Sequence, residues 1–158
     1  MYLRTLDTPE QASATAARIV LSVFKKKPNA TLGVTTGSTP EGLYAELRDA
    51  HARGEFTLAN SLAFALDEYV GLPASDPQSY ASIINETVTV PLGLDPARVH
   101  VPAGNAADLR QACDDYEAAI KAAGGVDVQI LGVGSNGHIG FNEPTSSLAS
   151  RTRIKTLN

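Results

Sequence analysis

The chain has 158 residues, of which 43% are hydrophobic and 19% charged, and these values are typical of one soluble globular domain with a substantial core. A formal net charge of −4 leaves no basic surface for nucleic acid, and the sequence has neither an apolar run long enough to cross a membrane nor a signal peptide. The single cysteine, Cys113, excludes an internal disulfide framework and predicts a cytoplasmic protein, with Cys113 itself as a small core residue of a helix.

The first half of the sequence alternates helical patterns with short apolar runs. Thr8, Pro9 and Gln11 form a capping pattern, so we expect a helix that begins there and that Pro28 stops. Its apolar residues recur at helical spacing and are expected to be buried: Ala12, Ala16, Ile19, Val20, Val23 and Phe24. The lysines 25–27 stand at its end, where cations complement the helix dipole. We then expect a strand over 30–35, a helix over 40–52, a strand over 61–66 and a short helix over 80–88.

The second half continues the alternation, and its predicted elements are a short strand over 98–101, a helix over 107–123, a buried strand over 126–133 and an extended segment over 152–157. This order is typical of βα units, so we expect an α/β fold: a three-layer α/β/α sandwich around a mostly parallel sheet. We expect residues 1–158 to form a single domain. The sequence stops at Asn158, on its last predicted strand and with no helix to cover the sheet, so we expect the domain to be incomplete after this residue.

The loop after the first predicted strand contains hydroxyl and glycine residues: Thr36, Gly37, Ser38 and Thr39, followed by Pro40. Backbone N–H groups at a helix start, together with such hydroxyls, can hold a phosphate. The loop lacks both the lysine of a P-loop and the glycine spacing of a dinucleotide-binding fold. A second interpretation is an ordinary strand–helix turn capped by Thr39, and the loop alone favours neither.

Two further loops carry ionisable groups. Asp67 and Glu68 follow the strand over 61–66. Burying two adjacent carboxylates there costs free energy unless they are solvated, paired with other groups or needed for function. Asn136, His138 and Glu143 fall in a glycine-rich loop, and an imidazole beside a carboxylate at a strand end is a candidate for proton transfer.

All three loops follow strands of one parallel sheet, so we expect them to converge on one cleft. An anion cradle, a carboxylate base and a His–Glu pair together predict proton abstraction next to a carbonyl of a phosphorylated small molecule. We expect His51 and His100 to be structural or exposed, and the scattered histidines and the cysteine give no ligand spacing for a metal.

With these motifs in hand, the chain resembles the glucosamine-6-phosphate deaminase (isomerase) family. The resemblance covers nearly the whole chain, and the segments that carry it are residues 32–40, 66–73 with 76–80, and 132–144 with 146–156. The Asp-Glu-Tyr sequence at 67–69 and Asn-Gly-His-Ile-Gly-Phe-Asn-Glu-Pro at 136–144 are highly specific in combination. The resemblance implies that glucosamine 6-phosphate and water are converted to fructose 6-phosphate and ammonia in amino-sugar catabolism, with no metal or organic cofactor.

The resemblance also implies roles for individual residues. Asp67 matches the base that moves the proton at C2, His138 matches the group that opens the sugar ring, and Glu143 matches the carboxylate that orients the imidazole. Asn136 stands where some members have aspartate; asparagine can orient His138 by a hydrogen bond but cannot take up a proton. The matches for substrate and phosphate binding are Thr36, Gly37, Ser38, Thr39 and Gly137.

In the allosteric, hexameric members of this family, Ser146, Arg153, Lys155 and Thr156 match a site for N-acetylglucosamine 6-phosphate. A solvated edge with two basic residues is the alternative. We therefore expect a homo-oligomer, hexameric if this chain is of the allosteric type. The family's chains continue well beyond Asn158, and the resemblance implies that their remainder supplies basic residues for the substrate phosphate.

Two other functions compete with deamination. A hydrolase similar to 6-phosphogluconolactonase would carry an arginine in place of Tyr69 and would lack the 141–144 continuation. A non-catalytic sugar-phosphate sensor would need the phosphate cradle but not Asp67, His138 or Glu143.

Overall fold

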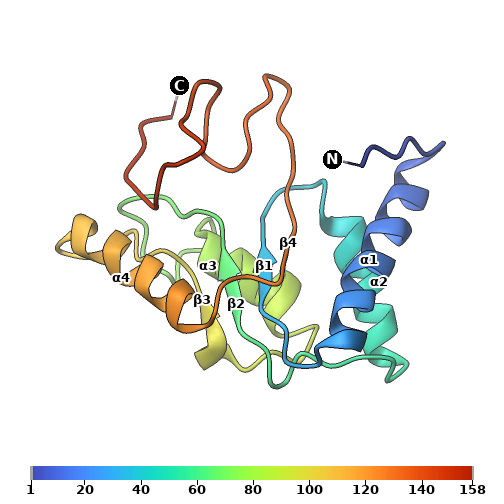
Figure 1. Cartoon of the computed structure of the whole chain (residues 1–158). Coiled ribbons are helices and arrows are strands. Elements are labelled where there is room, and N and C mark those ends of the chain that lie inside the picture. The colour runs from blue at the N-terminus through green and yellow to red at the C-terminus, as the bar shows by residue number, and fades with distance from the viewer. Residues whose placement is uncertain (1, 158) are drawn as a thin grey trace.

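A computed structural model describes residues 2–157 and contains a four-stranded parallel sheet in the order β3-β2-β1-β4 (Figure 1). Its strands are β1 (Leu32–Val34), β2 (Ala63–Ala65), β3 (Val99–His100) and β4 (Val128–Gln129). Leu32 pairs with Ala63 on one side and with Val128 on the other, so β1 is a central strand. Asn158, where we expect the domain to break off, lies outside the described residues.

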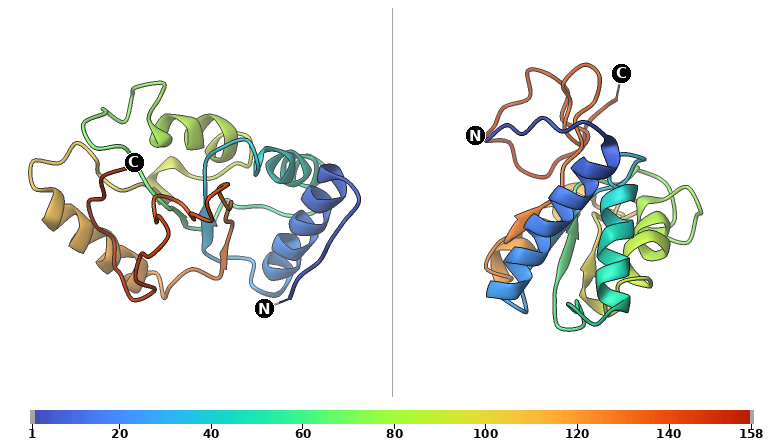
Figure 2. Two further views of the ribbon diagram at one scale, coloured as in Figure 1. Left: turned by 90° about the horizontal axis from the view of Figure 1, so that it is seen from above. Right: turned by 90° about the vertical axis from the view of Figure 1, so that its right-hand side faces the viewer.

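Helices cover both faces of this sheet. They are α1 (Pro9–Lys26), α2 (Glu41–Ala52), α3 (Tyr80–Ile84, continued by a π-helical turn at Asn85–Thr89) and α4 (Leu109–Ala122), with a short 3₁₀ turn at Pro96–Arg98. Figure 2 shows α2 and α3 on one face and α4 on the other. Right-handed crossovers place these helices on opposite faces, because the chain steps outward from β1 to β3 in one direction and then returns past β1 to β4 in the other. The expected α/β/α arrangement is confirmed. No helix within residues 2–157 is long and apolar enough to span a membrane.

The core lies between the sheet and helices α1–α3. Leu32 and Val34 of β1 are completely buried, as is Leu47 of α2. Helices α1 and α2 pack closely, since a Cβ on Gly42 would lie 2.5 Å from the Ser13 hydroxyl oxygen. The layers therefore hold β1, and the loop that follows it, in a fixed position.

Helix α1 begins as its capping pattern predicts. The Thr8 hydroxyl accepts a hydrogen bond from the Gln11 N–H at 3.2 Å, and the Gln11 side chain accepts one from the Asp7 N–H. The lysine run ends the helix, and Lys27 forms an ion pair of 2.8 Å with Asp127. The prediction that Ile19 is buried is wrong: Ile19 is 54% exposed, because it lies off the stripe that turns inward. Ala12 is exposed for the same reason.

The strand expected over 126–133 is much shorter and less buried than predicted. Only Val128–Gln129 pairs with β1, and Leu131 and Val133 are 48% and 71% exposed. The reason is that β4 is the edge strand of the sheet within residues 2–157, so its apolar side chains have a neighbouring strand on one side only. Cys113 is half-buried rather than a core residue, since Tyr116 is the buried residue of α4.

Candidate active site

The polar loops lie at the carboxyl edge of the sheet. Chain order reverses between β1 and β4, and in open α/β sheets this switch point is where ligands bind. The loop after β1 and the loop after β4 flank the switch point directly, and the loop after β2 lies one strand away.

The loop after β1 is anchored at its start and open at its tip. The buried Tyr44 hydroxyl accepts a hydrogen bond from the Thr35 N–H and donates one to the Thr35 carbonyl, and burial raises the pKa of Tyr44 to about 12. Gly37 has a φ of 99°, which favours glycine. Within the described chain, the N–H groups of residues 37–39 have no protein acceptor. The loop can therefore present these donors to an anion.

Thr39 does not cap α2. The helix begins at Glu41, Pro40 occupies the cap position, and no side chain forms a capping hydrogen bond there. The interpretation of this loop as a turn capped by Thr39 is therefore wrong, while Thr36, Ser38 and Thr39 remain available to a ligand.

The two adjacent carboxylates after β2 have different surroundings. Glu68 accepts hydrogen bonds from the N–H groups of Tyr80 (3.0 Å) and Ala81 (2.9 Å), so it caps α3. Asp67 is half-buried, and burial raises its pKa from 3.8 to about 6, opposed by the backbone N–H of Phe141. Burial thus brings Asp67 into the range that suits a general base near neutral pH.

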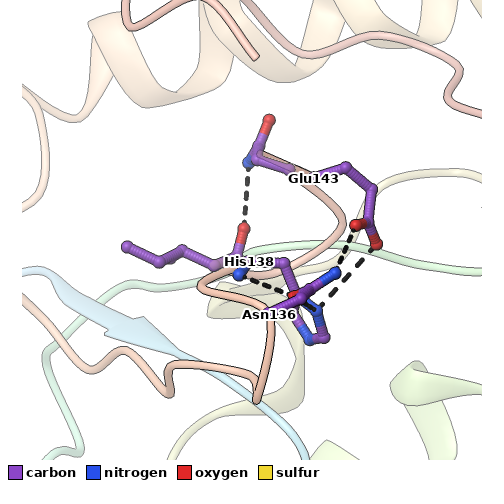
Figure 3. A network of polar contacts seen from close by, with 5 residues as sticks. Asn136, His138 and Glu143 are labelled. Atoms are coloured by element: carbon purple, nitrogen blue, oxygen red, sulfur yellow. Dashed lines mark hydrogen bonds and ion pairs between the residues drawn. The ribbon is translucent and has the colours of Figure 1, made fainter. Parts of the chain in front are cut away.

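Asn136 connects His138 to Glu143 (Figure 3). The Asn136 side-chain oxygen lies 2.7 Å from His138 Nδ1 and accepts a further hydrogen bond from the His138 N–H at 3.0 Å. Its amide nitrogen donates to Glu143 at 2.8 Å. Glu143 itself lies 3.9 Å from Nδ1, so it acts on the imidazole through Asn136.

This network fixes the state of the imidazole. Because the Asn136 oxygen can only accept, Nδ1 must carry the proton that it donates. Turning the amide over would set its oxygen against the Glu143 carboxylate and remove the acceptor for the His138 N–H. In neutral His138 the free nitrogen is therefore Nε2. The ring packs against Gly134, where any side chain would overlap it.

Asp67 and the loop after β4 meet directly. A Cβ on Gly140 would lie 3.0 Å from an Asp67 carboxylate oxygen, and the N–H of the next residue, Phe141, acts on the pKa of Asp67. The loop after β1 comes near them at Tyr80, because Thr36 lies close enough to oppose the rise in the pKa of Tyr80 that burial causes, and the Tyr80 hydroxyl lies 3.3 Å from the Tyr69 hydroxyl. The three loops therefore lie near one another, as their positions at one sheet edge predict.

A cavity of about 780 Å³ opens beside this meeting point. Asp67, Gly137 and Glu143 line it, together with one side of α4 and most of the segment 144–157. Among the described residues, neither the His138 ring nor the loop at 37–39, which could bind an anion, lines this cavity. The expectation that all three loops converge on one cleft is therefore met for the loops after β2 and β4 but not for the loop after β1.

The residues matched to an effector site lie near one another. Arg153 contacts the Ser146 hydroxyl at 3.4 Å, and both line the cavity with Lys155, whereas Thr156 does not. Their segment is held by Glu117, which accepts hydrogen bonds from the Thr152 N–H and hydroxyl, both at 2.8 Å. These bonds lower the pKa of Glu117.

Three residues of this region were not predicted as site residues from the sequence: Tyr80, Phe141 and Glu117. Tyr80 and Phe141 fall inside the motifs that carry the family resemblance, so membership of those motifs could have identified them as site residues. Nothing in the pattern of α4 singles out Glu117.

Comparison with known proteins identifies the family. A profile described as "Glucosamine-6-phosphate isomerases/6-phosphogluconolactonase" matches residues 7–149. The chain belongs to this family. A glucosamine-6-phosphate deaminase of Cutibacterium acnes is 58% identical over 142 residues, and one of Arthrobacter sp. (strain FB24) is 52% identical over 157 residues. These alignments cover 90% and 99% of this chain but 54% and 60% of the relatives, so this member of the family spans little more than half of their length.

Solved structures of the family agree with the fold. One described as a monomeric glucosamine-6-phosphate deaminase matches with a TM-score of 0.96 at 43% identity, covering 100% of this chain and 66% of the other. A 6-phosphogluconolactonase from Thermotoga maritima matches with a TM-score of 0.70 at 22% identity, covering 88% of this chain and 62% of the other. The second likeness is one of fold alone.

Proposed function

We propose that this protein is a glucosamine-6-phosphate deaminase. The observation that carries the proposal is the meeting of a half-buried carboxylate, Asp67, with the loop that holds His138 through Asn136 and Glu143. Relatives with 50% identity or more bear that name. The substrate is then a phosphorylated amino sugar, and the proposed chemistry uses proton transfer by these side chains without a cofactor or metal.

The first steps bind the substrate and open its ring. The N–H groups of residues 37–39 and the hydroxyls of Thr36, Ser38 and Thr39 bind the phosphate, and Gly137 lies at the cavity wall. His138, with Nε2 free, moves a proton between the anomeric hydroxyl and the ring oxygen, which opens the ring. Asn136 and Glu143 keep the imidazole in the required tautomer.

Asp67 then carries out the isomerisation. Its carboxylate takes the proton from C2 of the open-chain amino aldose while the C1 carbonyl oxygen gains a proton. The first proton is then returned to C1 as the nitrogen gives up one of its own, which leaves a CH2OH group at C1 and an imine at C2. Water adds to this imine and ammonia leaves, giving fructose 6-phosphate. A base with a pKa of about 6 is largely ionised at neutral pH and yet can still release the proton that it takes up.

The test is an ammonia-release assay with glucosamine 6-phosphate, run beside a hydrolysis assay with 6-phosphogluconolactone. We expect ammonia release by the native protein and a loss of at least about 1,000-fold in Asp67→Asn, because an amide cannot act as the base. Lactone hydrolysis without ammonia release would assign the protein to the other activity of its family. Phosphate-ester binding with neither reaction would indicate a sensor.

We further propose that Ser146, Arg153, Lys155 and Thr156 contribute to a site for N-acetylglucosamine 6-phosphate and that the protein acts as a cytoplasmic homo-oligomer. Three of these residues line the cavity beside Asp67, which supports the grouping. One related deaminase of known structure is described as monomeric, so the oligomeric state needs its own measurement by light scattering. Activation of the deaminase by N-acetylglucosamine 6-phosphate, lost in Arg153→Ala, tests the effector site.

A further inference from the structure

Three aromatic rings meet next to Asp67, and we name them the aromatic clasp: Tyr69, Tyr80 and Phe141. Their centroids lie 5.0 Å (Tyr69–Tyr80), 5.2 Å (Tyr69–Phe141) and 5.7 Å (Tyr80–Phe141) apart, with tilted planes. The rings come from three segments: the loop after β2, the first residue of α3 and the loop after β4. Aromatic pairs at such distances attract each other beyond simple burial.

The clasp bridges strands that are not neighbours. Strands β2 and β4 lie on opposite sides of β1, so the loop after β4 must extend across the end of β1 to reach Asp67. The sheet itself cannot hold the loop there, because β4 pairs only with β1 within the described residues. Contacts between the loops must do so, and the clasp supplies the aromatic part of them.

The bridge ends on the Asp67 carboxylate. Phe141 places its ring in the clasp, and the backbone N–H of the same residue opposes the rise in the pKa of Asp67 that burial causes. The neighbouring Gly140 packs against Asp67 and Leu66. Packing of one ring thus sets the position of a hydrogen-bond donor.

We propose that the aromatic clasp is a positioning device for the reaction: by docking Phe141, it holds the loop that carries His138 against Asp67 and keeps the Phe141 N–H close to the carboxylate. This inference rests on the proposed function, which gives Asp67 and His138 their roles. Tyr69, Tyr80 and Phe141 act through Asp67 and need not contact the substrate.

The proposal has a signature in the titration of Asp67. The other titratable groups that act on it are Glu68 on its own loop, Tyr80 on α3 and Tyr116 on α4, and none of them donates to the carboxylate. The Phe141 N–H opposes the rise in pKa caused by burial. If the Phe141 N–H moves away from Asp67, it no longer opposes the effect of burial, and the pKa of Asp67 rises further.

The experiment compares Phe141→Ala and Tyr80→Leu with Phe56→Ala. Phe56 is a half-buried phenylalanine that packs on Phe24, at 5.8 Å, away from the three loops, so its truncation controls for the loss of an aromatic contact. The titration of Asp67 is followed in the substrate-free protein by ¹³C carboxyl NMR, and kcat/KM for ammonia release is measured against pH.

In Phe141→Ala and Tyr80→Leu we expect the Asp67 titration and the acid limb of kcat/KM to move upward together, by about half to one pH unit. We also expect kcat/KM at pH 8 to fall about 10- to 100-fold, because His138 and Asp67 are no longer held together. Phe56→Ala should leave both measurements at their native values. Two clasp variants from different elements keep the test available if one of them fails to fold.

The proposal is overturned if both clasp variants keep the native Asp67 titration, whether or not their activity falls, since a merely structural ring lowers activity at every pH alike. An equal shift in Phe56→Ala overturns it as well. A native protein that titrates as expected but releases no ammonia refutes the proposed function and leaves the clasp supported by NMR alone.

Discussion

Asp67→Asn should make the protein inactive and, at neutral pH, more stable. A rise in pKa from 3.8 to about 6 means that the fold disfavours the ionised carboxyl by about two pH units, or about 3 kcal/mol. Because Asp67 is only half-buried, solvent reduces this, and we expect a gain of about 1–2 kcal/mol, or roughly 2–8 °C in Tm for a chain of this size.

The pH dependence gives the sign of the effect. Below pH 3.8 the carboxyl is protonated in both the folded and the unfolded chain, so aspartate carries no penalty there. The penalty grows between pH 3.8 and about 6 and is complete above pH 6. The gain in Asp67→Asn should therefore be largest at pH 7.5 and should shrink steadily as the pH falls toward 4.

Urea unfolding at pH 7.5 and pH 4.5, combined with the ammonia assay, measures both properties. Glu68→Gln is the matched control, because the neighbouring carboxylate accepts hydrogen bonds from the first turn of α3. Its neutralisation should cost about 1–2 kcal/mol, the opposite sign. The reasoning is refuted if Asp67→Asn is less stable than the native protein at pH 7.5, or if its advantage does not depend on pH.

Three further outcomes follow from the site. The acid limb of kcat/KM should have an apparent pKa of about 6, because Asp67 must be ionised to act; a limb near pH 4 would contradict its burial. His138→Gln should slow the ring-closed substrate about 100- to 10,000-fold, but slow far less a 5-deoxy analogue that cannot form the pyranose ring; equal slowing of both removes the ring-opening role. Gly134→Ala should lower kcat/KM about 100-fold by displacing the imidazole, whereas Gly132→Ala, which meets no atom within 4 Å, should not; similar rates in the two variants would show that the ring position is not critical.

Local signals in the sequence predicted the elements well. The Thr8 cap, the lysine run at the end of α1 and the alternation of helices with apolar runs all depend on residues close in sequence, and the structure contains the elements that they predict. The order of these elements was also enough to place the three polar loops at one edge of the sheet.

Features that depend on neighbours far along the chain were not predictable. The exposure of Leu131 and Val133 is set by the edge position of β4, which periodicity does not reveal. The contact between Tyr80 and Phe141 requires a loop to cross the end of β1, and no local pattern encodes that crossing. The different roles of Asp67 and Glu68 depend likewise on which carboxylate the first turn of α3 meets.

The pairing of β4 with β1 also has a consequence for how the protein folds. Leu32 meets Val128, and Lys27 meets Asp127, across nearly two thirds of the sequence, whereas β1, α2 and β2 form contacts between near neighbours. Pairing between distant segments loses a large loop-closure entropy before any contact energy is gained, so we expect β4 to dock late in folding. Recovery of turnover during refolding should then lag behind recovery of helical circular dichroism, which makes catalysis itself a kinetic probe of the final docking step.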